Sequence, residues 1–219
     1  MVQVKVCGIK KEEDASWAVN LGADILGFIF KSDNPRYISV ALAKKIIKTL
    51  PPFVFACGVF FDEDPAIIKK IVKSCGLKMV QLNGNETPDY CLNLKTLLAP
   101  LGDIKLMKYF KLQNESLLQM PAYRTEGSMA VDYFLVDAFN EGVPQGENAF
   151  MWDLASKVKE YAPVFLFGGL TGDNVIKAIQ YVRPYAVNVC ETIESDDMAI
   201  GRKDYEKMKV FIKKAKSIF

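Results

Sequence analysis

Eight short runs of apolar residues, rich in β-branched and aromatic side chains, recur along the chain. They cover residues 2–7, 25–30, 53–60, 78–83, 105–110, 133–138, 164–169 and 186–191. Runs of this length and composition are typical of strands that are buried on both faces. The pattern therefore predicts the strands of a parallel sheet.

The segments between these runs have the spacing of amphipathic helices. At 39–50, 65–76 and 205–219, apolar positions recur on one helical face and lysines occupy the other. Gly22 and Gly76 stand where two of the helices are expected to end, because glycine readily adopts the left-handed conformation of a helix C-cap.

Strand and helix alternate eight times, which is the pattern of a (β/α)8 TIM barrel of the α/β class. No linker rich in Pro, Gly or Ser and no low-complexity tract interrupts the alternation. We therefore expect one barrel domain over residues 1–219. The weakest part of the pattern is 111–132, where Gln, Asn, Ser and Pro residues obscure the fifth helix.

Charge and apolar content narrow the possible partners. Lys and Arg number 28 against 26 Asp and Glu, without the basic stripe that a nucleic acid would require. No apolar run approaches the roughly 20 residues that span a bilayer, and the chain enters a strand at Val2 without a leader. We expect a cytoplasmic protein that binds neither nucleic acid nor membrane, as a monomer or a homodimer.

The cysteines and the missing histidine limit the chemistry. Five cysteines lie at positions 7, 57, 75, 91 and 190 without C-x-x-C pairing, and the chain has no histidine. Disulfides and structural zinc are both disfavoured by this pattern. Any acid–base chemistry must therefore use Cys, Asp, Glu, Lys or Tyr.

Cys7 and Asp137 each follow the end of a short apolar strand, and a barrel gathers all such ends on one rim. A cysteine in an apolar strand is more often a small core residue, and an aspartate after a strand is often a cap or turn former. A shared rim favours proton transfer instead. The same rim collects Arg36, Asn83, Gly168, Gly169 and Glu191.

Six short motifs mark the ends of successive expected strands. They are Lys5-Val6-Cys7-Gly8-Ile9, Asn34-Pro35-Arg36-Tyr37-Ile38-Ser39, Gly58-Val59-Phe60, Val80-Gln81-Leu82-Asn83-Gly84, Val136-Asp137-Ala138 and Gly168-Gly169-Leu170-Thr171-x-x-Asn174-Val175. In this order they resemble the strand-end motifs of the N-(5′-phosphoribosyl)anthranilate isomerase family, from the first strand to the eighth.

The resemblance implies an Amadori rearrangement of a small phosphosugar in tryptophan biosynthesis, without cofactor or metal. By analogy with the family, Asp137 acts as general acid and opens the ribose ring, and Cys7 acts as general base at C2. A nearby cation such as Lys10 is expected to lower the pKa of Cys7. Lys5 should point into the barrel, hydrogen-bonded to Asn188.

Substrate binding is expected at two further places. The planar guanidinium of Arg36 suits the anthranilate carboxylate that the resemblance suggests. Gly168 and Gly169, ahead of a helix that starts near Asp173, let backbone amides approach the phosphate.

The chain departs from the family pattern in three places. Asn83 stands where the family usually has His, and it can still donate a hydrogen bond. The family's Gly-Gly-Thr-Gly run is replaced at 144–149. Its Asp-Val-Ser-Ser-Gly-Val-Glu run becomes Asn188-Val189-Cys190-Glu191-Thr192-Ile193-Glu194. Asn188 and Cys190 therefore lie at the loop expected to bind the phosphate, and Glu191 brings to it a negative charge that would repel the phosphate.

Three functions therefore remain open. The first is the isomerase reaction with a remodelled phosphate loop. The second is isomerisation of another aldose-derived substrate, one that need not carry a phosphate, as Glu191 suggests. The third is a ligand-binding barrel without catalysis, against which the retention of Cys7 and Asp137 speaks.

Overall fold

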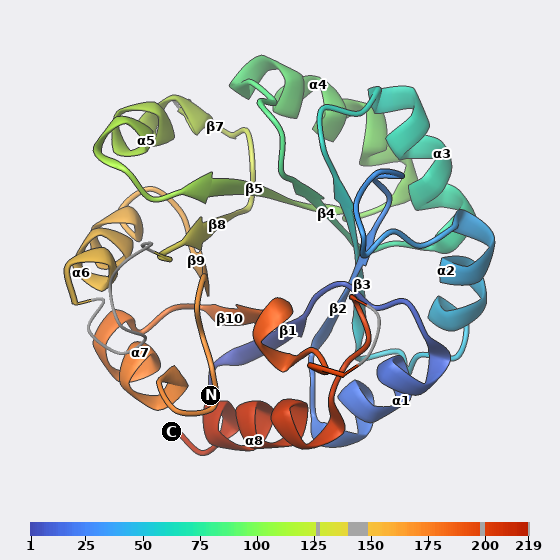
Figure 1. Ribbon diagram of the computed structural model, residues 1–219. Helices are drawn as coiled ribbons and strands as arrows, with labels where there is room; N and C mark the ends of the chain where they lie inside the picture. Colours follow the sequence, from blue (N-terminus) through green and yellow to red (C-terminus); the bar gives the residue numbers. More distant parts are fainter. Residues whose placement is uncertain (126–127, 140–148, 198–199, 219) are drawn as a thin grey trace.

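The structure, a computed structural model, describes residues 1–125, 128–139, 149–197 and 200–218. Among these residues, eight parallel strands close a barrel in the order β1-β10-β9-β8-β5-β4-β3-β2 (Figure 1). The strands are β1 (Gln3–Val6), β2 (Ile25–Ile29), β3 (Phe55–Phe60), β4 (Met79–Leu82), β5 (Lys105–Lys111), β8 (Tyr133–Asp137), β9 (Val164–Phe167) and β10 (Ala186–Val189). Every strand lies within two residues of its expected ends, and the (β/α)8 prediction is confirmed.

The helices surround the barrel as an outer ring (Figure 1). They are α1 (Glu12–Leu21), α2 (Val40–Ile47), α3 (Pro65–Cys75), α4 (Pro88–Leu98), α5 (Asn114–Gln119), α6 (Ala149–Val158), α7 (Val175–Val182) and α8 (Tyr205–Lys216). The predicted stops at Gly22 and Gly76 are confirmed, because both residues cap their helices with a positive φ of 101° and 70°. No helix in the described ranges is long and apolar enough to cross a membrane.

The segment with the weakest helical pattern has a composite structure. The short helix α5 runs into a 3-10 turn at Met120–Tyr123, and a two-stranded antiparallel pair, β6 (Arg124–Thr125) and β7 (Ser128–Met129), follows. Only six residues are α-helical here, so a helical periodicity could not develop over a longer stretch.

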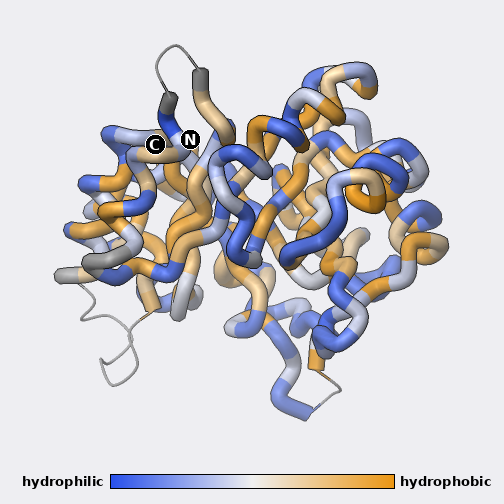
Figure 2. Tube along the Cα trace, turned by 90° about the horizontal axis from the view of Figure 1, so that it is seen from above, coloured by the Kyte–Doolittle hydropathy of each residue, from blue (hydrophilic) through white to orange (hydrophobic). Residues whose placement is uncertain are grey.

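The core has an outer shell and an inner filling. Apolar side chains of the helices pack against the outside of the strands, and Figure 2 shows hydrophobic and hydrophilic positions alternating along the helices. Inside the barrel, one apolar layer contains Ile25, Cys57, Met79, Met107, Leu135, Phe165 and Ala186. A smaller layer above it contains Cys7, Ile29, Val59 and Cys190. Cys57 is therefore a core residue, whereas Cys7 lies at the top of the filling.

Candidate active site

A cavity of about 310 Å3 opens at the carboxyl ends of the strands. Cys7 follows β1, Asp137 ends β8, and both side chains line this cavity. Cys7 is buried and Asp137 is half-buried, so both can meet a ligand that enters from the rim. Five other predicted site residues line the same cavity: Arg36, Asn83, Asn188, Cys190 and Glu191. The expected convergence of distant strand ends is thus present.

A larger cavity, of about 760 Å3, lies at the opposite end of the barrel. Its lining comes from both chain termini and from the segment between α7 and β10, and Arg183 is the charged side chain in it. Because no proton-transfer pair lines it, we place the candidate active site at the carboxyl rim despite the smaller volume.

Asp137 is held by two hydrogen-bond donors. The Tyr109 hydroxyl donates to Asp137 Oδ2 at 2.9 Å, and the Phe139 backbone N–H donates to Oδ1 at 3.0 Å. Burial, together with the charge of Asp137, raises the pKa of Tyr109, so the phenol keeps its proton. Gly168 passes directly over the carboxylate with a φ of 96°, and a Cβ there would collide with Asp137 Oδ1.

Cys7 lies between a second thiol and two buried lysines. The Cys190 thiol shares a hydrogen bond with Cys7, and Lys5 and Lys203 supply positive charge. The hydrogen bond and these cations outweigh burial and bring the pKa of Cys7 well below its usual range. The pKa of Cys190 moves in the opposite direction, because it is the donor and is also buried.

The expectation that Lys10 activates Cys7 is wrong. Lys10 Nζ donates instead to the backbone oxygen of Pro35 at 2.8 Å. Gly8, with a φ of 76°, turns the chain after Cys7 and carries Lys10 away from the barrel interior. Lys5 shares the inward face of β1 with Cys7, and its predicted hydrogen bond to Asn188 Oδ1 is confirmed at 3.0 Å.

Arg36 reaches the cavity but is already paired. Its Nε and Nη2 donate to Glu194 Oε1 and Oε2 at 2.7 and 3.0 Å. Its Nη1 lies 3.7 Å from Glu191 Oε1. Lys203 Nζ also contacts Glu194 Oε1, at 3.1 Å. One carboxylate therefore joins two cations beside the thiol pair.

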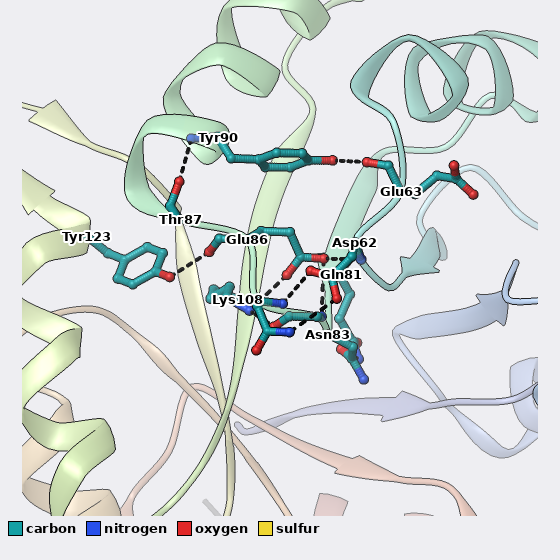
Figure 3. Close-up of polar contacts among 11 residues, drawn as sticks. Asp62, Glu63, Gln81, Asn83, Glu86, Thr87, Tyr90, Lys108 and Tyr123 are labelled. Atoms are coloured by element: carbon teal, nitrogen blue, oxygen red, sulfur yellow. Dashed lines mark hydrogen bonds and ion pairs between the residues drawn. The ribbon is translucent and has the colours of Figure 1, made fainter.

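Asn83 is presented by a loop that a buried ion pair stabilises. Lys108 Nζ lies 2.9 Å from Glu86 Oε2, and both side chains are almost fully buried (Figure 3). Glu86 Oε1 accepts hydrogen bonds from the backbone N–H groups of Asp62 and Gly84. The Gln81 side chain donates to Asn83 Oδ1 at 2.7 Å, which leaves the Asn83 amide nitrogen as a donor for a ligand.

Gly168 and Gly169 line a neighbouring cavity of about 380 Å3. It shares Asp137, Phe167 and Glu191 with the cavity around Cys7, so the two are continuous along the rim. Asn174 closes the loop by donating to the Gly169 carbonyl at 2.8 Å, one residue before α7. Glu191 is exposed at the mouth of both cavities. The altered loop at 144–149 lies, up to residue 148, outside the described residues.

In the parts of the chain that the structure describes, no three His, Cys, Asp or Glu side chains are grouped to hold a metal ion.

Comparison with known proteins shows the family to which the chain belongs. A family model described as "N-(5'phosphoribosyl)anthranilate (PRA) isomerase" matches residues 4–214. The chain belongs to this family. A relative named N-(5'-phosphoribosyl)anthranilate isomerase, from Trichlorobacter lovleyi, is 42% identical over 99% of this chain and 98% of its own length. One of the same name from Geobacter metallireducens is 40% identical over 99% and 100%.

Solved structures of phosphoribosylanthranilate isomerases have the same fold. The enzyme from Thermotoga maritima is 33% identical, with a TM-score of 0.83 over the full length of both chains. A phosphoribosylanthranilate isomerase in complex with reduced 1-(o-carboxyphenylamino)-1-deoxyribulose 5-phosphate is also 33% identical, with a TM-score of 0.82 over both full chains.

Several residues of this isomerase-family rim were missed by sequence reasoning. Tyr109 had a usable signal, because it shares strand parity with Met107, which points into the barrel. Glu194 stands in the altered motif after the eighth strand, but its pairing with Arg36, 158 residues away, forms only when the barrel closes. Lys203 had no signal of this kind, although its partners Cys190 and Glu194 are near it in sequence.

Proposed function

We propose that this chain isomerises N-(5′-phosphoribosyl)anthranilate, the Amadori rearrangement that serves tryptophan biosynthesis, with Cys7 as general base and Asp137 as general acid. The observation that carries the assignment of roles is the cavity that both side chains line. Family membership supports the reaction itself.

The acid step begins at Asp137. The protonated carboxyl gives its proton to the ribose ring oxygen, the C1–O bond breaks, and the furanose opens to a Schiff base. The donors Tyr109 O–H and Phe139 N–H then stabilise the carboxylate that is left. Because both donors are in place beforehand, they favour the charge that develops during ring opening.

The base step uses the thiolate of Cys7. It removes the proton from C2 of the Schiff base, and the electron pair moves through C1 to the nitrogen to give an enolamine. Tautomerisation of the enolamine gives the 1-amino-1-deoxyketose. A thiol whose pKa is lowered gives up its proton more readily than an ordinary cysteine, which suits this task.

Substrate binding follows the charges along the rim. Glu194 occupies the Nε and Nη2 side of Arg36, and we place the anthranilate carboxylate on the Nη1 side, where Glu191 now approaches. We place the phosphate against the backbone at Gly168 and Gly169, and the Asn83 amide as a donor to the substrate. The phosphosugar analogue bound by the 33% identical relative supports a ligand of this shape.

Turnover tests the proposal through the change of anthranilate-type fluorescence when substrate is added. Cys7→Ala and Asp137→Asn should each reduce kcat by several orders of magnitude while the folded state is retained. Cys75→Ala and Asp103→Asn, on α3 and before β5, are matched controls that should keep wild-type rates. Wild-type protein that binds the substrate without converting it would instead identify a non-catalytic barrel.

Glu191 favours a second candidate, an isomerase for a substrate without phosphate. Its carboxylate lines the cavity beside Gly168 and Gly169, where it would repel a phosphate. The two candidates differ in the effect of Glu191→Ser. For a phosphorylated substrate the variant should lower KM about tenfold, whereas no gain would favour the substrate without phosphate.

A further inference from the structure

Lys5 is a buried cation with neutral hydrogen-bond partners. Its side chain is fully buried inside the barrel, and Nζ donates to Gln81 Oε1 at 2.8 Å and to Asn188 Oδ1 at 3.0 Å. Within the described residues, no carboxylate lies within ion-pair distance of Lys5. A buried ammonium without a negative partner is strongly disfavoured, so the charge of Lys5 requires another anion.

Cys7 is placed to be that anion. It lies two residues after Lys5, and its side chain, like that of Lys5, is buried inside the barrel. Both side chains meet above Gly27 of the neighbouring strand β2. A Cβ at Gly27 would lie 2.7 Å from Cys7 Sγ and 3.1 Å from Lys5 Nζ, so the missing side chain makes room for the pair.

Cys190 approaches Cys7 from the other side, on β10. The register of β1 and β10 ends with Val6 opposite Val189, and Cys7 N–H donates to the Val189 carbonyl at 2.9 Å. Cys7 and Cys190 are therefore the next pair across the two strands, and both side chains are buried in the same layer of the barrel filling.

The proton of this thiol pair belongs on Cys190. Lys203 Nζ lies 3.9 Å from Cys190 Sγ, but it also binds Glu194 at 3.1 Å. Arg36 shares Glu194 and lies 3.7 Å from Glu191, so these two cations face two carboxylates. Glu191 follows Cys190 directly and adds negative charge there. Cys7, in contrast, faces the uncompensated charge of Lys5, so the negative charge is more stable on Cys7.

We propose that Cys7 rests as a thiolate before substrate arrives, with Lys5 as its buried counter-ion and the Cys190 thiol as its hydrogen-bond donor. Lys5 and Cys190 are then positioning residues that act through Cys7. Asn188 has a part in this arrangement, because its neutral amide orients Lys5 without cancelling its charge. The role of this ion pair in catalysis rests on the proposed function. The existence of the ion pair does not depend on it.

The other charged and titratable groups around Cys7 do not replace Lys5 as the counter-ion. They are Arg36, Cys57, Tyr109, Asp137, Glu191 and Lys203. The two cations among them are paired with Glu194. Burial raises the pKa of Cys57 to about 12 and also raises that of Tyr109, so both stay protonated. Neither Asp137, the proposed acid, nor Glu191 carries a positive charge, so neither can be what stabilises a thiolate.

The directions of the two pKa shifts agree with an ion pair. The hydrogen bond from Cys190 lowers the pKa of Cys7, burial opposes this, and the charges of Lys5 and Lys203 lower it further. Burial lowers the pKa of Lys5, yet the negative charge of Cys7 raises it above its usual value overall. Each group therefore stabilises the charged form of the other.

Alkylation of Cys7 by iodoacetamide, followed over pH by mass spectrometry of the Cys7 peptide, measures the thiolate fraction without any substrate. In the wild type, the rate should stay constant from alkaline pH to below neutrality. Lys5→Met should reduce the rate at neutral pH at least tenfold, because the aliphatic stem is kept and the counter-ion is lost. Lys10→Met is the matched control and should leave the rate unchanged.

Substitutions at Asn188 and Cys190 test the same pair from its two sides. Asn188→Asp should reduce the alkylation rate at neutral pH several-fold, because the new carboxylate neutralises Lys5 and repels the thiolate. Cys190→Ala should also reduce it, and Cys190→Ser should restore most of the rate because a hydroxyl donates in place of the thiol. Thiolate ultraviolet absorbance of each folded variant should follow the same order.

A wild-type Cys7 that titrates near the ordinary thiol value of about 8.5 would overturn the proposal. An unchanged profile in both Lys5→Met and Asn188→Asp would overturn it as well. Neither result depends on turnover. A Cys7→Ala variant that still converts substrate would remove the assigned base, while the alkylation profile would continue to report the ion pair.

Discussion

Arg36 and Glu194 form a two-point ion pair, with Nε–Oε1 and Nη2–Oε2 distances of 2.7 and 3.0 Å, although 158 residues separate them. The pair joins the loop after β2 to the segment after β10, on the rim that carries the candidate active site. Lys203 adds a second cation to the same carboxylate at 3.1 Å. Glu194 therefore holds these segments of the rim together through two cations.

Glu194→Gln should destabilise the protein and loosen Arg36. Both side chains are largely buried, at 16% and 11% exposure, so the loss should lie between the ~1 kcal/mol of an exposed pair and the ~3–5 kcal/mol of a fully buried one. Denaturant unfolding measures it. Glu12→Gln, which breaks an exposed pair with Lys45, should cost under about 0.5 kcal/mol. Equal losses in the two variants would contradict the role of Glu194.

The stabilisation by Glu194 should depend on pH in a defined direction. Burial alone would raise the pKa of Glu194, but the hydrogen bonds and charges of Arg36 and Lys203 outweigh it and lower the pKa. The contribution is therefore complete above the unfolded pKa of about 4.3 and is lost as pH falls through the lower folded pKa. The stability difference between wild type and Glu194→Gln should shrink on acidification below about pH 4. A difference that stays constant as the pH falls well below about 4 would exclude the predicted linkage.

Tyr109→Phe should slow the acid step. The variant removes the donor to Asp137 Oδ2, and a hydrogen bond to a charged group is worth about 1.5–3 kcal/mol, so kcat should fall roughly tenfold to a hundredfold. Tyr181→Phe, whose hydroxyl bonds the exposed Asp153 on α6, is the control and should keep the wild-type kcat. Unfolding of both variants by denaturant separates a catalytic effect from a structural one. A Tyr109→Phe enzyme with full kcat would remove the assigned stabilising role.

Gly168→Ala should displace the Asp137 carboxyl in addition to straining the backbone. A Cβ at Gly168 would strike Asp137 Oδ1, and the φ of 96° already disfavours any other residue. Gly102 has a similar φ of 108°, but a Cβ there would meet nothing within 4 Å. Gly102→Ala should therefore lose about 1–3 kcal/mol of stability with normal kcat. Gly168→Ala should lose at least as much stability together with most of its kcat, and normal turnover in it would show that Asp137 tolerates displacement.

The order of strands and helices was readable from the sequence because it depends on local periodicity. A strand that is buried on both faces is mostly apolar, and the run that ends at Asp137 meets that condition. The run that ends at Cys7 is interrupted by Gln3 and by the buried Lys5, but its valines still mark it as a strand. The closed parallel barrel then brings both residues to one rim, since every strand ends at the same face. The fold and the meeting of Cys7 and Asp137 at one rim were thus contained in the pattern of the chain.

Only the tertiary structure decided which groups act on these residues. Lys10 is close to Cys7 in sequence but points away, whereas Lys203, 196 residues after Cys7, lies beside it. The contact between Cys7 and Cys190 depends on the register of β1 against β10, which forms when the last strand closes the barrel against the first. Charge balance in a buried site is set by side chains from several strands at once. No single stretch of sequence contains that information, because local periodicity specifies which face a side chain takes and not which partner it meets there.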